Sequence, residues 1–399
     1  MLTYLTAGES HGPQLTAIID GLPAGLTIDL DQLNFQLARR QKGYGRGGRM
    51  KIEKDRAQVV SGLRHGRSIG SPITVVIPNK DWENWTEIMD PFKPLPKKLG
   101  LKKERLAKHT TKPRPGHADL PGGVKWQHHD LRNVLERASA RETAARTAIG
   151  SLARQFLEAF EIRFASHVVR IGDVALPDTT KRPPVDKIAA ITEDSEVRCI
   201  DEKIGDEMKE AIRLAKKKRD SLGGIVEIIV SGLPIGLGGL AQWSDRLDGK
   251  LAQALMSVHS VKGVEIGMGF GAAAALGSNV HDEIFYDKKG DPRKKNFFRK
   301  TNRAGGLEGG MTNGEDLVLR VASKPISTLN QPLKTVDVKS KKAEEAMVER
   351  TDNCVVPALG VVCEAVVALV LADAFMHRFG SDNMDQIRRN FQSWLASEY

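Results

Sequence analysis

Two histidines in short glycine-containing passages are the first candidates for acid–base chemistry. His11 lies in the passage GESHG, and His117 lies in the passage RPGHAD. A histidine side chain gains or loses its charge near neutral pH, so it can give a proton to a leaving group. Glycine lets the backbone approach a ligand closely. Taken alone, the first passage is more often a turn with a hydrogen-bonded histidine, and the second is as often a capped turn as a functional site.

A passage rich in arginine and glycine, residues 39–49 (RRQKGYGRGGR), predicts a site for anions. The guanidinium group binds carboxylates and phosphates in a planar, two-pronged geometry. A dinucleotide-binding fingerprint must follow a strand and open a helix, whereas this passage follows a helical pattern. Segments of the RGG type that bind nucleic acid are repeated and disordered, whereas this passage is short and lies within ordered pattern.

Three more passages place polar groups beside glycines or at helix ends. The passage ERASARET puts Arg137 and Arg141 on one predicted helix face, and the alternative is a surface face of ion pairs. Residues 305–310 with Lys324–Thr328 suit a bound phosphate or the edge of a flavin, and the alternative is an ordinary hairpin. Residues 350–352 (RTD) precede an apolar helix, where an aspartate can also serve simply as a cap.

No metal site is predicted. His128-His129-Asp130 has the composition of a ligand set, but no further Cys/His pair at ligand spacing accompanies it. We interpret this passage as a helix start with Asp130 as the cap. The cysteines, Cys199, Cys354 and Cys363, form no C-x-x-C pair, which argues against a disulfide framework or structural zinc and fits a reducing cytosol.

The overall charge narrows the class of partner. Lys and Arg total 60 against 50 Asp and Glu, a net charge of +10, which suits nucleic acid, an anionic membrane or anionic small ligands. The first residues lack the basic start and apolar core of a signal peptide. Val355–Ala372 resembles a membrane span, but it contains Pro357, Gly360 and Glu364 and no second span exists, so we expect a buried core helix and no membrane.

The elements that must position these residues occur in two similar series. Residues 18–26 (IIDGLPAGL) match residues 229–237 (IVSGLPIGL). Each match follows a predicted strand, Gln14–Ile19 or Gly224–Val230, and each precedes a helical pattern. The apolar faces of these helices are Leu30, Leu33 and Leu37, after a capping box at Asp29 and Gln32, and Leu247, Leu251 and Leu255.

The same order continues through the rest of each series. Predicted strands at Ile73–Ile77 and Leu317–Val321 are followed by long helices opening at Arg137 and Arg350 and ending near Phe160 and Phe375. Matching order in successive elements favours an internal duplication, with halves of about 1–165 and 225–380 joined by 166–224, which holds an amphipathic helix at about 207–219. We predict one domain over residues 1–399 of the α/β (α+β) class, layered, with its site where the halves meet.

Together these passages resemble the chorismate synthase family. The resemblance rests on residues 8–23 (GESHGPQLTAIIDGLP), 136–152 (ERASARETAARTAIGSL) and 350–366 (RTDNCVVPALGVVCEAV), and on RRQKGYGRGGRM, RPGHADLPGG, TNRAGGLEGGMTNG and KPIST. It covers nearly the whole chain in order, and three long signatures are highly specific. The resemblance implies a β-α-β sandwich, a homotetramer and a cytoplasmic location.

The family activity is the anti-1,4 elimination of phosphate from 5-enolpyruvylshikimate 3-phosphate to give chorismate, the last common step of the shikimate pathway to aromatic amino acids. The resemblance implies the same lyase reaction here, with reduced FMN required but not consumed and NADPH as a candidate reductant. It implies a small-molecule substrate and no nucleic acid. Two alternatives stay open, an NADPH-dependent flavin oxidoreductase and a basic nucleic-acid-binding protein.

The resemblance also assigns residues. His11 matches the histidine that protonates the departing phosphate, His117 the histidine that faces the reduced flavin, and Asp352 with Ser10 the group that handles the flavin N5 proton. Matches to FMN-contacting positions are Arg137, Ala138, Ser139, Gln253, Ala254, Gly309, Lys324, Pro325, Ile326, Ser327, Thr328 and Arg350. Arg46, Arg49 and Arg141 match substrate-side arginines, and Arg40 and Arg46 match positions linked to NADP. Ala138 and Thr351 depart from the common pattern, each shifting one hydrogen bond worth about 1 kcal/mol.

Overall fold

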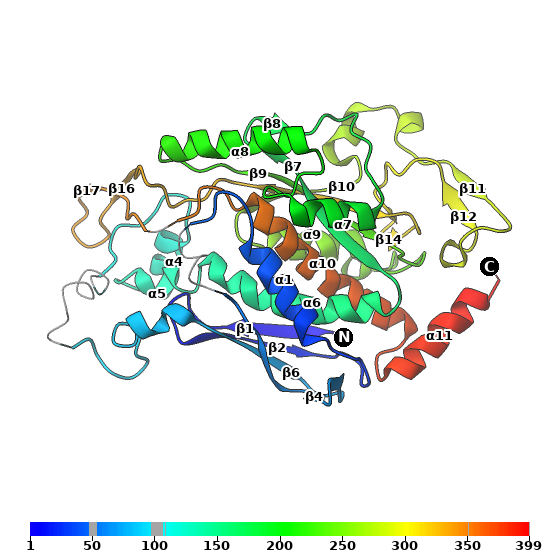
Figure 1. Cartoon of the computed structure of the whole chain (residues 1–399), viewed down its shortest axis with the longest axis horizontal. Coiled ribbons are helices and arrows are strands. Elements are labelled where there is room, and N and C mark those ends of the chain that lie inside the picture. The colour runs from blue at the N-terminus through cyan, green and yellow to red at the C-terminus, as the bar shows by residue number, and fades with distance from the viewer. Residues whose placement is uncertain (48–53, 97–106, 108, 350, 399) are drawn as a thin grey trace.

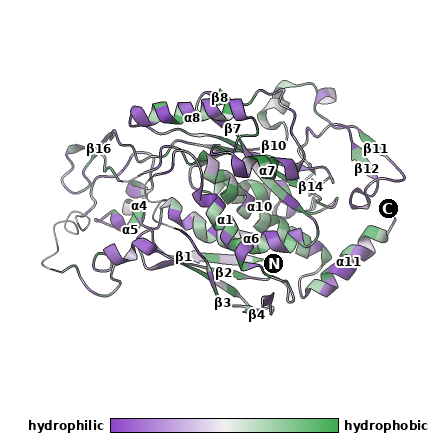
Figure 2. Cartoon of the chain, viewed as in Figure 1, coloured by the Kyte–Doolittle hydropathy of each residue, from purple (hydrophilic) through white to green (hydrophobic). Residues whose placement is uncertain are grey.

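Two antiparallel sheets enclose a layer of helices (Figure 1). The computed structural model describes residues 1–399 except 48–53, 97–106, 108, 350 and 399. Helices α1 (Leu30–Gln41), α6 (Thr143–Glu158), α9 (Leu247–Met256) and α10 (Val356–Phe379) lie between the sheets. Hydrophobic residues gather along them (Figure 2). The mixture of helices and open sheets confirms the predicted α+β class and its β-α-β layering.

The first sheet is built from the N-terminal part of the chain. Its order is β1 (Thr3–Ala7), β2 (Gln14–Asp20), β6 (Ile73–Pro78) and β3 (Gln58–Ser61), with every neighbouring pair antiparallel. Alternate residues of β2 are buried, because successive side chains of a strand point to opposite faces. The buried face packs on α6, and the other face is open.

The second sheet is buried more deeply. Its order is β10 (Val261–Ile266), β15 (Leu317–Ser323), β9 (Gly224–Ser231), β7 (Arg163–Ile171) and β8 (Val174–Ala175). Helix α10 packs on β7 and β9 from the interior, while α7 (Val185–Asp194) and α8 (Glu202–Lys217) cover the outer side. Strands covered on both faces favour runs of apolar residues over strict alternation, as the buried run in β9 shows.

The central helices differ in how far their apolar surface extends. In α1 (Leu30–Gln41) and α9 (Leu247–Met256) the buried residues form one face, whereas α10 (Val356–Phe379) is buried almost all round. Its strongest packing partner is α6 (Thr143–Glu158). By length and composition α10 could cross a membrane, but 89% of its apolar window is buried inside the protein, as in a core helix.

Shorter elements connect the layers. They are β4 (Leu63–Arg64), β5 (Arg67–Ser68), η1 (Lys80–Asn84), α4 (Asp119–Trp126), α5 (Arg132–Leu135), η2 (Ala140–Glu142), η3 (Trp243–Asp245), η4 (Gly269–Ala274), η5 (Gly277–Asn279), β11 (Ile284–Tyr286), η6 (Pro292–Lys294), β12 (Phe297–Arg299), β13 (Leu307–Glu308), β14 (Met311–Thr312), β16 (Lys334–Val336), β17 (Ala343–Glu345) and α11 (Met384–Ala396). The N-cap position of α5 is occupied by Leu131, so the prediction that Asp130 is the cap was wrong by one residue, although the Asp130 carboxylate accepts from the backbone N–H of Arg132 in the first turn.

The two matching GLPxGL passages adopt similar backbone conformations. Gly21 and Gly232 have φ values of 92° and 80°, and Gly25 and Gly236 have values of 83° and 85°. Only glycine takes such angles without a steric cost. Each passage leads from an antiparallel strand towards a central helix, as expected. The duplication into two halves nevertheless stays a prediction.

Other local expectations about the helices were wrong. The helix predicted to open at Arg137 begins at Thr143, because Ser139 is extended and caps the short η2 turn instead. Arg137 and Arg141 therefore share no helix face. The last long helix begins at Val356, where Pro357 fits the first turn, and Leu30, expected on the apolar face of α1, is exposed.

Candidate functional site

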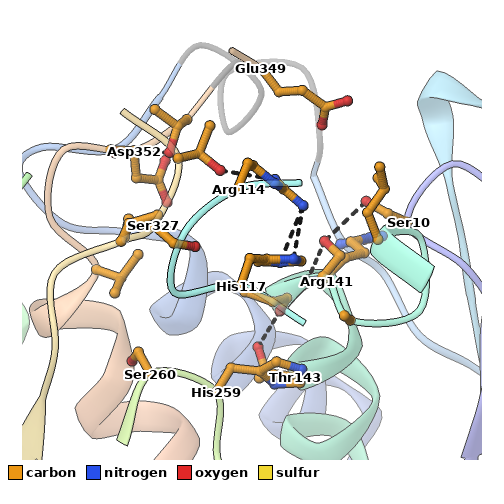
Figure 3. A pocket seen from close by; sticks show the side chains of 18 of the residues that line it. Ser10, Arg114, His117, Arg141, Thr143, His259, Ser260, Ser327, Glu349 and Asp352 are labelled. Atoms are coloured by element: carbon orange, nitrogen blue, oxygen red, sulfur yellow. Dashed lines mark hydrogen bonds between the residues drawn. The ribbon is translucent and has the colours of Figure 1, made fainter. Parts of the chain in front are cut away.

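A cavity of about 770 Å³ lies where loops from distant parts of the chain meet (Figure 3). Residues 10–11, 114, 116–118, 138–141 and 143 contribute from the first part of the sequence. Residues 258–260, 324–328, 347–349 and 351–352 contribute from the second, and the N-terminal part of α10 closes one wall. A cavity of this size suits a cofactor together with a small substrate.

Glu136 and Trp85 contact His11 directly in the cavity wall, and Arg132 supports both of them. Its Nδ1 lies 2.9 Å from Oε1 of Glu136, and its backbone N–H donates to Oε2 of the same carboxylate. The imidazole ring stacks on Trp85 with ring centroids 4.0 Å apart. The guanidinium of Arg132 covers Trp85 and also donates to Glu136. These contacts fix the orientation of the imidazole ring in the cavity lining.

The charge state of Glu136 supports that arrangement. Burial by itself raises the pKa of a carboxyl group, but hydrogen bonds from His11 and the nearby Arg132 charge outweigh it and hold the pKa of Glu136 below its usual range. Glu136 is therefore ionised at neutral pH and can only accept hydrogen bonds. The Nδ1 atom of His11 must then carry a hydrogen.

His117 is held in the same way by a different carboxylate. Its Nδ1 lies 2.6 Å from Oδ1 of Asp119, which is fully buried. Arg114 donates to Asp119 from Nε at 2.8 Å and also reaches Oγ1 of Thr328 at 2.9 Å. Burial opposes ionisation of Asp119, but its bonds to His117 and Arg114 hold its pKa well below the usual range. The site thus contains two histidine–carboxylate pairs.

Buried arginines form another wall. Nη1 of Arg141 lies 2.6 Å from Oδ1 of Asp55. Arg40 donates from Nε to Oγ1 of Thr143 and from Nη2 to the carbonyl of Ala140, both at 2.9 Å. Its Nη1 has no hydrogen-bond partner among the described residues and lies 3.6 Å from Asp55. Burial lowers the pKa of Arg40 to about 9, and Arg141 and Arg46 add to this effect, yet it stays protonated at neutral pH.

Asp352 and Ser10 both line the cavity but lie on opposite sides of it in Figure 3. Nη1 of Arg46 is 2.9 Å from Oδ2 of Asp352, whose other oxygen accepts from the backbone of Gly47. Ser10 accepts a hydrogen bond from the hydroxyl of Ser139 at 3.1 Å. Asp352 is therefore an ionic anchor for an arginine as well as a candidate proton-handling group.

The segment Lys324–Thr328 lines the cavity, as do Ala138, Ser139 and Thr351. Nζ of Lys324 donates to the carbonyl of Gly116, so this segment and the His117 loop are tied together.

Other predicted residues lie apart from the lining. Arg137 donates to the carbonyl groups of Thr6 and Gly8. On α9, Gln253 is exposed and Ala254 is half-buried. Gly309 is exposed in the turn between β13 and β14. Arg49 and Arg350 lie outside the described residues.

The sequence analysis missed several groups that shape the cavity. They are Trp85, Arg114, Arg132 and His259 in the lining and the carboxylates Asp55, Asp119 and Glu136 behind it. Arg114, Asp119 and Glu136 belong to passages already singled out, so a search for partners of the histidines could have found them. Nothing around Trp85 or His259 distinguishes them locally. Among the residues that the structure describes, no three His, Cys, Asp or Glu side chains are grouped as metal ligands.

Comparison with known proteins gives a consistent result. The family described as chorismate synthase matches residues 2–376. A chorismate synthase of Geotalea uraniireducens (strain Rf4) is 51% identical over 399 residues, covering 99% of this chain and 98% of the relative. Chorismate synthase 1 of Bacillus cereus (strain ZK / E33L) is 52% identical over 391 residues, covering 98% of each. A crystal structure of a chorismate synthase aligns with a TM-score of 0.78 at 39% identity, covering 99% of this chain and 97% of the other.

Proposed function

The chain belongs to the chorismate synthase family, a family of lyases, and from this premise we propose the reaction that it catalyses. It removes phosphate and a hydrogen at C6 from 5-enolpyruvylshikimate 3-phosphate by anti-1,4 elimination and releases chorismate. Reduced FMN is required without net redox change. One observation carries the proposal: two histidine–carboxylate pairs, those of His11 and His117, line a single arginine-rich cavity.

The charge of the cavity suits this substrate. The substrate carries two carboxylates and a phosphate monoester, so a closed site needs several cations to offset the charge. Arg40, Arg46 and Arg141 line the cavity, and the first two also remain candidates for contact with NADPH as reductant. Arginine keeps its charge when buried better than lysine does, so this wall can bind anions without losing its positive charge.

His11 is the acid in this proposal. Glu136 accepts from Nδ1, and Nε2 of the protonated ring would donate to the departing phosphate. As the C–O bond breaks, negative charge grows on the phosphate, and a proton from Nε2 neutralises it. Glu136 then stabilises the imidazolium form before each turnover and holds the ring in place.

The residues of the cavity fit FMN. Nη1 of Arg40 is a buried donor with no hydrogen-bond partner in the described part of the chain, and Lys324 and the hydroxyls of Ser327 and Thr328 lie along the same lining. Arg40 and Lys324 would hold anionic groups of the cofactor, and His117 would face its ring. When bound, reduced FMN supplies electron density to the allylic C–O bond as it breaks. The roles of Arg137, Gln253, Ala254 and Gly309 in cofactor binding stay predictions.

The proposal also includes the oligomeric state and the cellular location that are typical of the family. We expect a cytoplasmic homotetramer with no nucleic acid partner. Large apolar side chains, among them Trp243 at 85% and Phe270 at 82% relative exposure, lie on the surface of this chain. Exposed apolar groups of this kind mark protein interfaces, which supports self-association.

An anaerobic assay tests the proposed function directly. The purified protein is mixed with dithionite-reduced FMN and 5-enolpyruvylshikimate 3-phosphate, and chorismate and inorganic phosphate are measured. Equimolar release of both products is the expected result. Absence of chorismate with reduced FMN present would contradict the proposal, and tight binding to polynucleotide at physiological salt would favour the nucleic-acid alternative.

A further inference from the structure

The segment Asn79–Trp85 lies beside the loop that carries His11. It starts directly after β6 and contains the short helical turn η1. Asn79 is 5% exposed and Trp85 is 4% exposed, although asparagine is mostly an exposed residue in proteins. A buried amide needs hydrogen-bond partners inside the protein, so the partners of Asn79 indicate its role.

The Asn79 side chain binds the backbone of the His11 loop. Its Nδ2 donates to the carbonyl of Gly12 at 2.7 Å and to that of Glu9 at 3.2 Å. Its backbone N–H donates to the carbonyl of Pro13 at 3.0 Å. These carbonyl groups lie on both sides of His11 in the sequence, so one residue holds the loop before and after the proposed acid.

The other end of the same amide binds an arginine of the cavity wall. Oδ1 of Asn79 accepts from Nε of Arg141 at 3.0 Å, and Arg141 lines the cavity. Asparagine at the start of a helix commonly caps its first turn, but within the described residues the Asn79 side chain makes no capping hydrogen bond to η1. Both ends of the amide therefore join the His11 loop to Arg141.

Trp85, at the other end of η1, contacts the imidazole ring itself. Its backbone N–H donates to the carbonyl of Trp82 at 2.8 Å, and the N–H of Trp82 donates to the carbonyl of Asn79 at 3.1 Å. The turn thus fixes Trp85 relative to Asn79. The indole stacks on His11 with an angle of 25° between the ring planes. Such contacts between aromatic rings are favourable, so rotation of the imidazole away from Trp85 is disfavoured.

We propose that Asn79 and Trp85 are positioning residues for the acid step. Asn79 sets the distance between the His11 loop and Arg141, and Trp85 sets the orientation of the imidazole ring. The inference rests on the proposed function, in which His11 protonates the departing phosphate and Arg141 binds the same substrate.

The acid step depends on such positioning. Proton transfer requires the donor to lie within hydrogen-bond reach of the leaving oxygen, and a misplacement of about 1 Å can cost about 100-fold in rate. A rigid link between the acid, His11, and a substrate-binding arginine, Arg141, meets this requirement.

Three substitutions separate the two contributions. Asn79→Asp keeps the shape and an acceptor oxygen but removes the Nδ2 donor, so its bonds to the loop carbonyls are lost. Trp85→Leu removes the aromatic face, and Trp85→Phe keeps one. The matched controls are Asn84→Asp in the same turn and Trp126→Leu, both at exposed positions. Circular dichroism and urea titration show whether each variant is folded, and the Trp85 variants decide the question if Asn79→Asp does not fold.

Steady-state kinetics in the wild-type and His11→Ala backgrounds form a double-mutant cycle. We expect Asn79→Asp and Trp85→Leu to lower kcat about 10- to 100-fold with KM changed less than about threefold. Trp85→Phe should keep most of the wild-type kcat. In the His11→Ala background the same substitutions should change kcat less than about twofold, because residues that act as a unit are not additive. Equal losses in both backgrounds, or wild-type kcat in both variants, overturns the proposal.

Nuclear magnetic resonance of protein labelled with carbon-13 in its histidine rings tests the geometry without turnover. The signals of His11 are those that disappear in His11→Ala. Protons above an aromatic face resonate upfield, so the His11 ring signals should move downfield in Trp85→Leu and stay in place in Trp126→Leu. Asn79→Asp should displace them as well. Unmoved His11 signals in both variants overturn the proposal.

The two proposals can fail separately, because the resonance measurement needs no substrate. A protein in which both variants displace the His11 signals but which makes no chorismate contradicts the proposed function alone. A protein that makes chorismate, with unmoved His11 signals and equal losses in both backgrounds, contradicts this inference alone.

Discussion

Nδ1 of His11 lies 2.9 Å from Oε1 of Glu136, although 125 residues separate them in the sequence. The same carboxylate accepts the backbone N–H of His11, so one buried group fixes both the ring and the loop that carries it. Ser10 adds a third link, because its backbone N–H donates to the carbonyl of Glu136. The position of the proposed acid, His11, thus depends on Glu136, which directly follows α5.

Glu136→Gln should lower turnover by about 10- to 100-fold, because it removes a charged hydrogen bond that stabilises the imidazolium form of His11. Steady-state rates from pH 5.5 to 9 check this. Glu9→Gln, an exposed change in the same loop, is the control, and an unaltered profile in Glu136→Gln would exclude the proposed coupling.

Alanine substitutions of His11 and His117 should have different effects on turnover and flavin binding. His11→Ala should lower single-turnover rates by about 100- to 10,000-fold, the usual contribution of general acid catalysis, while FMN affinity stays near that of the wild-type protein. His117→Ala should also weaken the binding of reduced flavin or change its protonation. Both effects should vary between about pH 6 and pH 8. If both variants keep wild-type rates, these histidines are structural.

Reduced FMN should be needed but not consumed. With flavin reduced beforehand under argon, many molecules of chorismate should form for each flavin, and no NADPH should be oxidised in step with product. Parallel measurement of absorbance by NADPH and of chorismate gives the ratio. One NADPH oxidised per product would point instead to an ordinary flavin oxidoreductase.

The buried carboxylate of α10 should control acid stability. Glu364 accepts from Arg39, Arg154 and Ser166. Burial opposes its ionisation, but Arg39 and Arg154 outweigh burial and lower its pKa from 4.5 to about 2. Because the folded pKa is depressed, the stabilisation is present above about pH 4.5 and disappears as the pH falls towards 2.

Glu364→Gln should therefore lower the free energy of unfolding by about 3–5 kcal/mol at pH 7, since it leaves buried arginines without their partner. The gap to the wild-type protein should narrow as the pH falls through that window. Urea titrations at several pH values measure it. Glu210→Gln, which breaks an exposed pair with Arg213, should change little, and a constant gap at all pH values would refute the assignment.

The two parts of the chain should fold as one unit. Helix α10 packs against α6 and also against β7 and β9, so residues 1–170 alone would expose the apolar surface that α10 covers. This fragment should aggregate or lack native-like circular dichroism when expressed alone. A soluble, cooperatively unfolding monomer of residues 1–170 would disprove the prediction.

The local pattern of apolar residues was enough to predict most helices and strands. The strands at Ile73–Pro78 and Gly224–Ser231 and the buried leucines of α9 follow from runs of apolar residues and their period. The apolar composition of α10 likewise predicted a buried helix. The start of α6 could not be predicted from local pattern, because Ser139 and Thr143 are both acceptable in or before a helix. Tertiary contacts, such as that of Arg40 with Thr143, determine where the helix begins.

By itself, the sequence determined the family, the elements and the identity of the two histidines, because these depend on residues close together in the chain. Only the tertiary structure decided which distant residues contact the groups of the site. Trp85 reaches His11, Asp55 reaches Arg141, and Glu142 faces His259 across long loops. Side-chain periodicity specifies which face of an element is buried but not which distant element covers it, so these pairs exist only once the chain has folded.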